Sequence, residues 1–254
     1  MLKLLVTVVL AGAISQVATL ATTVYLHRAL SHRALTVRAP LSFFFRAVIW
    51  LSTGIKPRQW VAVHRKHHAF TDTAEDPHSP AVVGWLRVQL TNAALYRKAA
   101  RDPRVVERYA KDLPPDRWDR VLFDRAFVGL GIGIALLIVI LGPWYGLVGA
   151  VLHTGFYLWI GGAVNSLGHH FGRRPYENSA TNLKWLAWFT VGEGLHNNHH
   201  AAPTSARFSL HRGEVDLGWI AIRVFRRLGL AKVRLEELKV LAQAAAKTKR
   251  RLPA

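Results

Sequence analysis

The stretch "AFVGLGIGIALLIVILGPWYGLVGAVLHTGFYLWIGGAVN", residues 126–165, contains 40 consecutive residues without a charged side chain. One helical crossing of a bilayer core needs about 20 apolar residues, so this run is long enough for two. Gly142, Pro143 and Gly146 lie near its middle and predict a tight turn. We therefore predict two membrane spans, over about residues 126–142 and 147–165.

Two further apolar stretches precede this hairpin. Residues 4–26 are uncharged, and as a helix they measure about 35 Å, enough to cross a core of roughly 30 Å. A signal peptide is the alternative, but its apolar region is usually only about 7 to 15 residues long. Residues 39–55 are shorter, and Arg46 in their middle would cost about 2.5 to 3.5 kcal/mol at the bilayer centre. We predict a span over 4–26 and an interfacial or re-entrant helix over 39–55.

The basic residues indicate how these spans are oriented. The chain is 51% hydrophobic and has a formal net charge of +19. Lysine and arginine number 18 between residues 27 and 125 and 15 after residue 165, of 34 in all. The positive-inside rule places both basic blocks in the cytoplasm and the turn at 142–146 outside. Because the charge follows the spans, we attribute it to topology and to anionic lipid, and we expect no nucleic-acid partner.

The predicted fold class is therefore an all-α integral membrane protein of the multi-pass kind, with three to four membrane-embedded helices. A cytoplasmic helical cap, residues 56–125 and 166–240, is expected to carry a histidine-rich dimetal site. Residues 216–230 within this cap alternate apolar and basic side chains in the manner of a surface helix. A basic tail, 241–254, completes a single domain spanning 1–254.

The histidines gather at the cytoplasmic ends of the predicted spans. On a helix, positions i, i+3 and i+4 lie close together, so an H-x-x-H-H triplet is expected to aim three imidazoles at one point. His27 and His32 are five residues apart, about 140° around an ideal helix, and converge only at a helix end or a local distortion. Imidazole is a common ligand for iron, zinc and copper, and nine exceed what one ion holds. Two ions with four or five ligands each are implied, and the candidates are His27, His32, His64, His67, His68, His169, His196, His199 and His200.

Such a site has no anionic ligand. Nearby acids are therefore expected to support it by accepting hydrogen bonds from the ring nitrogens that do not bind the metal. The acids next to the histidine motifs are Asp72, Glu75, Asp76 and Glu193. The same residues are equally compatible with solvated loop positions. The remaining histidines have no neighbour at ligand spacing and are expected to be structural: His78, His153, His170 and His211.

These motifs resemble those of the membrane fatty acid desaturases, in particular the acyl-CoA (stearoyl-CoA type, Δ9) branch. The similar segments are "HRALSH", "HRKHHAFTDTAEDPH", "PWY" at the outer turn, "NSLGHHFGRRPY" and "VGEGLHNNHHAAP". The resemblance covers about residues 23–227. It implies that the nine histidines hold two iron ions, and that Asn165 supports one of them through a water molecule. Because imidazole also binds zinc, zinc is expected to replace iron in overproduced protein.

The resemblance implies an O2-dependent enzyme that introduces a cis double bond, expected at Δ9, into a saturated acyl chain, expected to be an acyl-CoA. The reaction consumes two external electrons, and we recognise no haem, flavin or nicotinamide motif in the sequence. A ferredoxin or cytochrome b5-like carrier, with its NAD(P)H reductase, is therefore the expected partner. The basic residues near the motifs are candidate contacts for this partner or for lipid headgroups: Arg65, Lys66, Arg173 and Arg174. A related di-iron lipid hydroxylase and a histidine-rich metal transporter are the alternatives.

Overall fold

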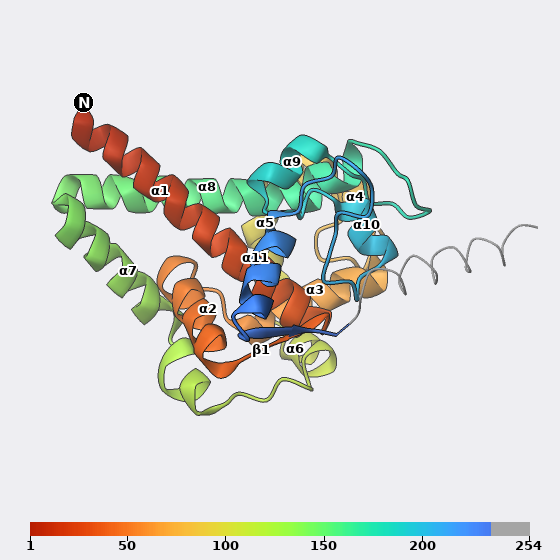
Figure 1. Cartoon of the computed structure of the whole chain (residues 1–254), viewed down its shortest axis with the longest axis horizontal. Helices are drawn as coiled ribbons and strands as arrows, with labels where there is room; N and C mark the ends of the chain where they lie inside the picture. The colour runs from red at the N-terminus through yellow and green to blue at the C-terminus, as the bar shows by residue number, and fades with distance from the viewer. Residues whose placement is uncertain (235–254) are drawn as a thin grey trace, which may run out of the picture.

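Two long helices form the frame of the computed structural model, which describes residues 1–234. The helix α1 (Leu2–Ala21) continues without a break into a π-helix, η1 (Thr22–Ser31). The helix α8 (Pro143–His170) packs against α1, and the two cross in Figure 1. Within the described part of the chain, these are the two helices long and apolar enough to cross a membrane. The predicted spans 4–26 and 147–165 fall inside them, whereas the predicted tail at 241–254 and the end of the cap, 235–240, lie outside the described residues.

The predicted hairpin before α8 is present. The helix α7 (Ala126–Leu141) ends at Gly142, whose φ of 85° lies in the left-handed region that glycine tolerates best. Directly after this turn, α8 begins at Pro143. A Cβ atom at Gly146 would lie 2.5 Å from the Ile138 Cα, so only glycine permits this close approach of α7 and α8. The predicted break at 142–146 is thus a single glycine turn, and α8 starts earlier than residue 147.

The helix α2 (Ala39–Ser52) extends only partway along this frame. At its end, the Ser52 carbonyl accepts a hydrogen bond from His153 Nε2 at 2.8 Å, and His153 Nδ1 lies 2.9 Å from Ser15 Oγ. Ser15 and His153 belong to the middle portions of α1 and α8, so α2 stops beside them. After α2, the chain turns at Gly54 (φ 63°) and returns through α3 (Pro57–Phe70). Residues 39–55 therefore form a short helix followed by a return of the chain, and their placement as an interfacial or re-entrant helix stays a prediction.

Arg46, which argued against a membrane crossing by α2, is compensated by carboxylates. Its guanidinium pairs with Asp116 at 2.7 Å and with Asp119 at 2.6 Å, and lies over the ring of Phe123. These partners come from the segment around the π-helix η2 (Asp119–Phe123), which precedes α7. The charge is therefore neutralised locally and is not exposed to the lipid, consistent with α2 entering from the side that carries η2.

The remaining elements surround one end of α8 and of η1. They are the helices α4 (Pro80–Val83), α5 (Trp85–Ala100), α6 (Pro103–Tyr109), α9 (Lys184–Phe189), α10 (His196–Ala201) and α11 (Leu217–Arg227). The predicted surface helix at 216–230 corresponds to α11. A short antiparallel pair, β1 (Leu35–Val37) with β2 (Ala231–Val233), was not predicted; its register sets Thr36 opposite Lys232.

The outer surfaces of α1, α7 and α8 are strongly apolar. Exposed large side chains on these helices include Leu5, Val9, Phe127, Val139, Val151 and Trp159. Contiguous apolar surface of this kind is rarely left in contact with water. By contrast, the buried core lies where η1, α2 and α11 meet, around Leu26, Phe45 and Ile222. The exposed apolar helices therefore support a membrane-embedded region, with the core cluster lying next to the histidine-bearing end.

Candidate metal centre

The π-helix η1 brings the first two histidines together. In a π-helix the hydrogen bonds run from residue i to residue i+5, so residues five apart lie on one face. The His32 amide donates to the His27 carbonyl at 3.1 Å, and the two imidazole centroids are 5.0 Å apart. The sequence analysis required a helix end or a local distortion for this pair to converge. The structure provides both, since η1 is distorted and ends at Ser31.

The third histidine motif lies on α10, a short helix that is fixed by its two asparagines. The Asn197 side-chain amide donates to the carbonyls of Tyr176 and Ala180, at 2.9 and 3.0 Å. The Asn198 side-chain amide donates to the Phe208 carbonyl at 2.8 Å. Both asparagines are almost completely buried. In "HNNHH", the asparagines therefore anchor the helix to the surrounding loops, while the histidines point elsewhere.

The nine predicted histidines form two groups in which the nitrogen atoms that can bind a metal lie within 4.8 Å of one another. They come from the end of η1, from α3, from the last turn of α8 and from α10, which gather at one end of the molecule (Figure 1). The five-histidine group contains His27, His32, His64, His68 and His199. The four-histidine group contains His67, His169, His196 and His200.

This grouping shows that one expectation was wrong. An H-x-x-H-H triplet does not aim three imidazoles at one point, because positions i+3 and i+4 differ by about 100° around the helix axis. On α3, His64 and His68 belong to the five-histidine group, whereas His67 belongs to the other. On α10 the same division separates His199 from His196 and His200. Each triplet therefore supplies two ligands to one group and one to the other.

The imidazoles have the chemical form that metal binding requires. Burial, together with the neighbouring imidazoles, lowers the pKa of His64, His68 and His199 well below the ordinary value of 6.5. The rings are therefore neutral at pH 7 and retain a nitrogen lone pair. In four pairs the Nε2 atoms face each other at 2.8 to 3.2 Å: His32 with His64, His27 with His199, His68 with His199, and His196 with His200.

Two more nitrogen atoms point to the same conclusion. Within the described residues, Nε2 of His67 and Nε2 of His169 are buried and have no hydrogen-bond partner. An unsatisfied buried polar atom costs about 1 to 3 kcal/mol, so such atoms are rare unless a ligand satisfies them. A cation between the converging nitrogens would accept these lone pairs. The donor set, made of imidazole nitrogens, fits iron or zinc.

Three carboxylates orient three of these rings from behind. His27 Nδ1 lies 2.7 Å from Glu193, His67 Nδ1 lies 3.0 Å from Asp76, and the distance from His169 Nδ1 to Asp72 is 2.9 Å. In each pair the Nδ1–H donates to the carboxylate, which leaves Nε2 free to bind an ion. The three acids highlighted in the sequence therefore contact ligand-type histidines in the structure. Glu75, the fourth, is exposed.

The charges of these acids are consistent with that arrangement. Burial by itself would raise the pKa of Glu193 and of Asp76. The paired histidines reverse this effect, so both pKa values are lowered overall. Glu193 additionally accepts a hydrogen bond from the Thr23 hydroxyl, which lies on η1 one turn before His27. All three acids are thus carboxylates at neutral pH. Their negative charge would balance part of the positive charge of two bound cations.

Asn165 and His78 are two further polar residues beside the four-histidine group. Asn165, one turn before His169, donates a hydrogen bond to Asn92 at 3.1 Å, and its water-mediated support of an ion stays a prediction. His78 was expected to be structural, yet its ring lies 4.8 Å from that of His67, and its ring nitrogens have no hydrogen-bond partner among the described residues. With His67 and Asp76 it forms a further set of possible ligands. In the sequence, the only indication that His78 lies near the site was its position two residues after Asp76.

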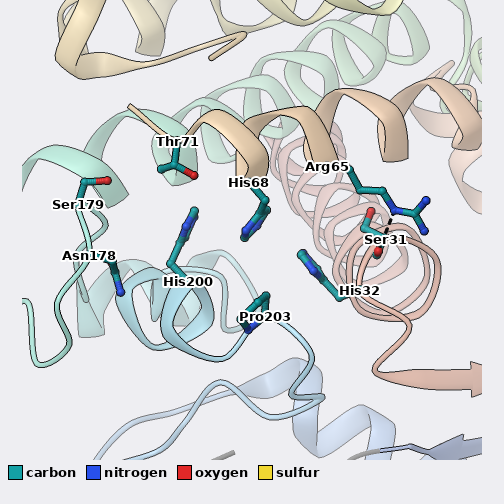
Figure 2. Close-up of a pocket in the computed structure, with 9 residues that line it drawn as sticks. All are labelled: Ser31, His32, Arg65, His68, Thr71, Asn178, Ser179, His200 and Pro203. Carbon is teal, nitrogen blue, oxygen red and sulfur yellow. Dashed lines mark hydrogen bonds between the residues drawn. The ribbon is translucent and has the colours of Figure 1, made fainter. Parts of the chain in front are cut away.

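A polar cavity of about 580 Å³ opens onto both groups. Figure 2 shows the imidazoles of His32, His68 and His200 along it. The first two belong to the five-histidine group and the third to the four-histidine group. The other lining residues are Ser31, Arg65, Thr71, Asn178, Ser179 and Pro203. Both groups are therefore accessible from one polar opening.

The four candidate partner contacts differ in exposure. Arg173 and Arg174 are exposed in the loop after α8, and Arg174 donates to the Ser179 carbonyl at 3.2 Å. Lys66 is half-buried on α3. Arg65 lines the cavity, but its guanidinium is engaged in bonds within the protein. Arg173 is therefore the most suitable of the four for a contact with another molecule.

Comparison with known proteins agrees with this geometry. The sequence model of the family described as "Fatty acid desaturase" matches residues 3–218. This chain belongs to the fatty acid desaturase family. It is thus related to membrane enzymes of lipid metabolism that are oxidoreductases, and the nine histidines lie within the matched region.

The similar curated desaturases are mostly Δ9 enzymes. The sn-1 stearoyl-lipid 9-desaturase of Synechocystis sp. is 32% identical over 81% of this chain, which spans 64% of that enzyme's length. The Delta-9 acyl-lipid desaturase 2 of Arabidopsis thaliana is 34% identical, over 82% of this chain and 68% of the relative. The Acyl-CoA C20 Delta5-desaturase of Anemone leveillei is 35% identical, over 83% of this chain and 67% of the relative. Membership of the family, and of its Δ9 branch, agrees with the resemblance seen in the sequence motifs.

Proposed function

We propose that this desaturase-family chain is an O2-dependent di-iron acyl desaturase, which introduces a cis double bond at Δ9 into a saturated acyl chain. The observation that carries the proposal is the division of nine imidazoles into a group of five and a group of four. Each group has enough ligands for one ion, and the two groups share the helices α3 and α10. A chain that held one ion would need no second group.

When bound, the two irons would supply the oxidising power that removal of hydrogen from unactivated methylenes requires, and no side chain has that power. The overall reaction balances with one O2, two electrons and two protons: the acyl chain loses two hydrogens, and two water molecules form. The protein holds the ions through the imidazoles and keeps three rings oriented through Asp72, Asp76 and Glu193. The buried rings of His67, His196 and His199 keep bulk water away from most of the site.

An apolar cavity supports an acyl substrate. It measures about 370 Å³ and lies between α1, α8 and α9. Its lining includes Phe156, Trp159, Ile160, Trp185 and Phe189. The helix α9 leads directly to the segment that carries Glu193 and α10, so the cavity lies close in the chain to the third histidine motif. Such a lining suits an alkyl chain, which gains about 0.8 kcal/mol for each buried methylene.

We propose an acyl group esterified in a membrane glycerolipid as the first substrate to test, and acyl-CoA, expected from the motifs, as the second. The relatives from Synechocystis and Arabidopsis are named as lipid desaturases. Two relatives from Anemone leveillei are named as acyl-CoA desaturases, at 35% and 34% identity. The names of the relatives therefore support both carriers, and lipid desaturases are the more numerous among the relatives considered.

Expression in a host that lacks unsaturated fatty acids tests the reaction. Gas chromatography of the host lipids is expected to show a cis-Δ9 monounsaturated chain, two hydrogens lighter than its precursor. A hydroxylated chain would support the hydroxylase alternative, and unchanged lipids together with altered metal uptake would support a transporter. His64→Ala is expected to abolish the product, whereas the matched control His211→Ala, an exposed histidine outside both groups, is expected to retain it.

The carrier is distinguished with purified protein in membranes. Labelled stearoyl phospholipid and labelled stearoyl-CoA are supplied separately, and the product is analysed before any acyl transfer. Conversion of the phospholipid alone supports the lipid substrate, and conversion of the thioester alone supports acyl-CoA.

We propose that the two electrons come from a separate acidic carrier, such as a ferredoxin, that docks near the polar cavity. The exposed Arg173 and the net charge of +19 support this choice, because opposite charge accelerates association and makes it depend on salt. Arg173→Glu is expected to slow turnover with the carrier and to flatten its salt dependence. The matched control is Arg104→Glu, at an exposed arginine on α6. Unchanged salt dependence in Arg173→Glu would contradict docking at this residue.

A further inference from the structure

Arg65 lies between His64 and His67 in the sequence, yet its side chain points away from the imidazoles and toward the end of η1. Its guanidinium makes five hydrogen bonds. Three are to backbone carbonyls: Nε donates to Ser31 at 2.9 Å, Nη2 to Leu30 at 2.8 Å, and Nη1 to Tyr109 at 2.9 Å. The other two are to the Asp112 carboxylate, at 2.5 and 3.1 Å.

The two carbonyls on η1 explain what these bonds accomplish. The last carbonyls of a helix have no partner within the helix and need one elsewhere. Leu30 and Ser31 are the last two residues of η1, and Ser31 directly precedes His32. Arg65 therefore satisfies the helix end that presents His32, and Figure 2 shows its bond to Ser31 beside that imidazole.

At the other end of its side chain, Arg65 belongs to the turn of α3 that carries His64 and His68. The Nε2 atoms of His32 and His64 face each other at 2.8 Å, and the centroids of His32 and His68 are 4.5 Å apart. Arg65 thus bonds two helices at the place where their ligands converge. An arginine is suited to this task because its planar guanidinium offers five donors in a fixed geometry.

Asp112 holds the guanidinium in place. This carboxylate follows α6 and also accepts a hydrogen bond from Arg33, the residue after His32. Arg33 has a φ of 52°, in the left-handed region, so the chain turns sharply there after His32. The loop after α6 therefore binds both partners of the contact between η1 and α3. It binds the chain after η1 through Arg33, and it binds α3 through Arg65.

We propose that Arg65, held by Asp112, is a positioning residue for the five-histidine group, and that it sets the distance between His32 and the pair His64 and His68. This proposal rests on the two-metal function proposed above. It replaces the sequence-based interpretation of Arg65 as a contact for a partner or a lipid headgroup.

The proposal predicts an unequal effect on the two ions. His32, the ligand next to the clamped carbonyls, belongs to the five-histidine group. The four-histidine group is oriented by other contacts, namely Asp72 on His169, Asp76 on His67 and Asn197 within α10. The helix α3 is also packed against α6 through Ala62, Val105 and Ala110, independently of Arg65. Loss of Arg65 is therefore expected to release one end of the five-histidine group and leave the other group in place.

The experiment measures metal binding in the full-length protein in detergent, loaded anaerobically with ferrous iron. Iron per chain is determined by mass spectrometry, and Mössbauer spectra distinguish the two sites. The variants are Arg65→Ala, Arg65→Lys and the matched control Arg58→Ala. Arg58 lies on the same helix and donates to the Ala110 carbonyl at 3.4 Å, so it contacts the same loop through a different bond.

Wild type and Arg58→Ala are expected to hold two ions. Arg65→Ala is expected to bind one of them about 10- to 100-fold more weakly, the usual effect of removing a residue that orients a ligand. Arg65→Lys is expected to recover part of this affinity, because an ammonium retains the charge but reaches fewer of the acceptors. The Mössbauer signal that remains in Arg65→Ala should be that of a single type of iron.

Four results overturn the proposal. Two ions bound with wild-type affinity in Arg65→Ala would show that the contact does not position the ligands, and so would an equal loss of both ions in a folded protein. If Arg65→Ala does not fold, Asp112→Asn decides: a weakened single ion supports the proposal, and unchanged binding of both overturns it. A wild-type protein that holds at most one ion would instead overturn the two-metal function and this inference together.

Discussion

The buried ion pair between Arg28 and Asp216 allows a quantitative test of how η1 is held. Both side chains are completely buried, and Arg28 Nη2 donates to Asp216 at 2.8 Å. Arg28 also donates to the Ala206 carbonyl, and its guanidinium lies 3.8 Å from the centre of the Phe208 ring. The pair connects the residue after His27 to the segment that follows the third histidine motif.

Arg28→Met removes one charge and leaves the other buried. Breaking a buried ion pair in this way typically costs about 3 to 5 kcal/mol. Asp216 retains hydrogen bonds from the amides of Phe208 and Trp219, at 2.7 and 2.8 Å, so these two donors still partly stabilise its charge. We therefore expect about 3 kcal/mol. For a protein of this size, about 2 to 4 °C of Tm corresponds to each kcal/mol, so the expected decrease is roughly 6 to 12 °C.

The assay is thermal unfolding of the purified protein in detergent, followed by tryptophan fluorescence. The double variant Arg28→Met with Asp216→Asn removes the remaining charge and keeps a side-chain oxygen for one of the two amides, which donate to different oxygens of Asp216. It is expected to regain part of the loss, because most of the penalty comes from the uncompensated carboxylate. Arg104→Ala, which breaks the surface pair with Asp102, serves as the control and should leave Tm unchanged. A decrease in Arg28→Met no larger than in this control, or a double variant no better than the single one, would refute the reasoning.

Three further predictions follow from the site and the topology. Glu193→Gln and Asp76→Asn should each weaken metal binding about 10- to 100-fold in a metal titration, while Glu75→Gln, at an exposed acid, should have no effect. The metal-free protein should lose stability as pH falls below about 6.5. Burial and neighbouring imidazoles lower the pKa of His64, His68 and His199 in the folded protein, so below this pH these residues bind protons in the unfolded chain but not in the folded one. A Tm that stays flat between pH 7 and pH 5 would contradict this. In intact cells, Trp144→Cys in this cysteine-free chain should react with an impermeant thiol reagent and Arg58→Cys should not. The reverse pattern of labelling would invert the proposed orientation.

The candidate metal site shows which features the spacing of residues along the sequence predicts and which it does not. The nine histidines selected from the sequence lie together in the structure, and three of the four acids selected with them contact these histidines, whereas Glu75 does not. The division into five and four was missed, because an H-x-x-H-H motif specifies directions around one helix axis only. Which neighbouring helix meets each direction depends on packing. For the same reason, Arg65 was predicted to contact a partner or a lipid headgroup. An arginine beside a histidine motif looks the same in the sequence whether it contacts another molecule or a carbonyl of its own chain.

The sequence by itself determined the long apolar helices and which histidines gather in space. A backbone in lipid must satisfy its hydrogen bonds internally, so long uncharged runs such as 126–165 specify helices without help from distant residues. The tertiary structure alone decided the rest: that His27 and His32 converge through a π-helix, that α2 stops beside His153, and that Arg65 and Arg28 turn inward to hold η1. These features depend on contacts between segments up to 188 residues apart, as for Arg28 and Asp216. Local periodicity contains no information about such contacts, because their energy exists only after the helices have packed.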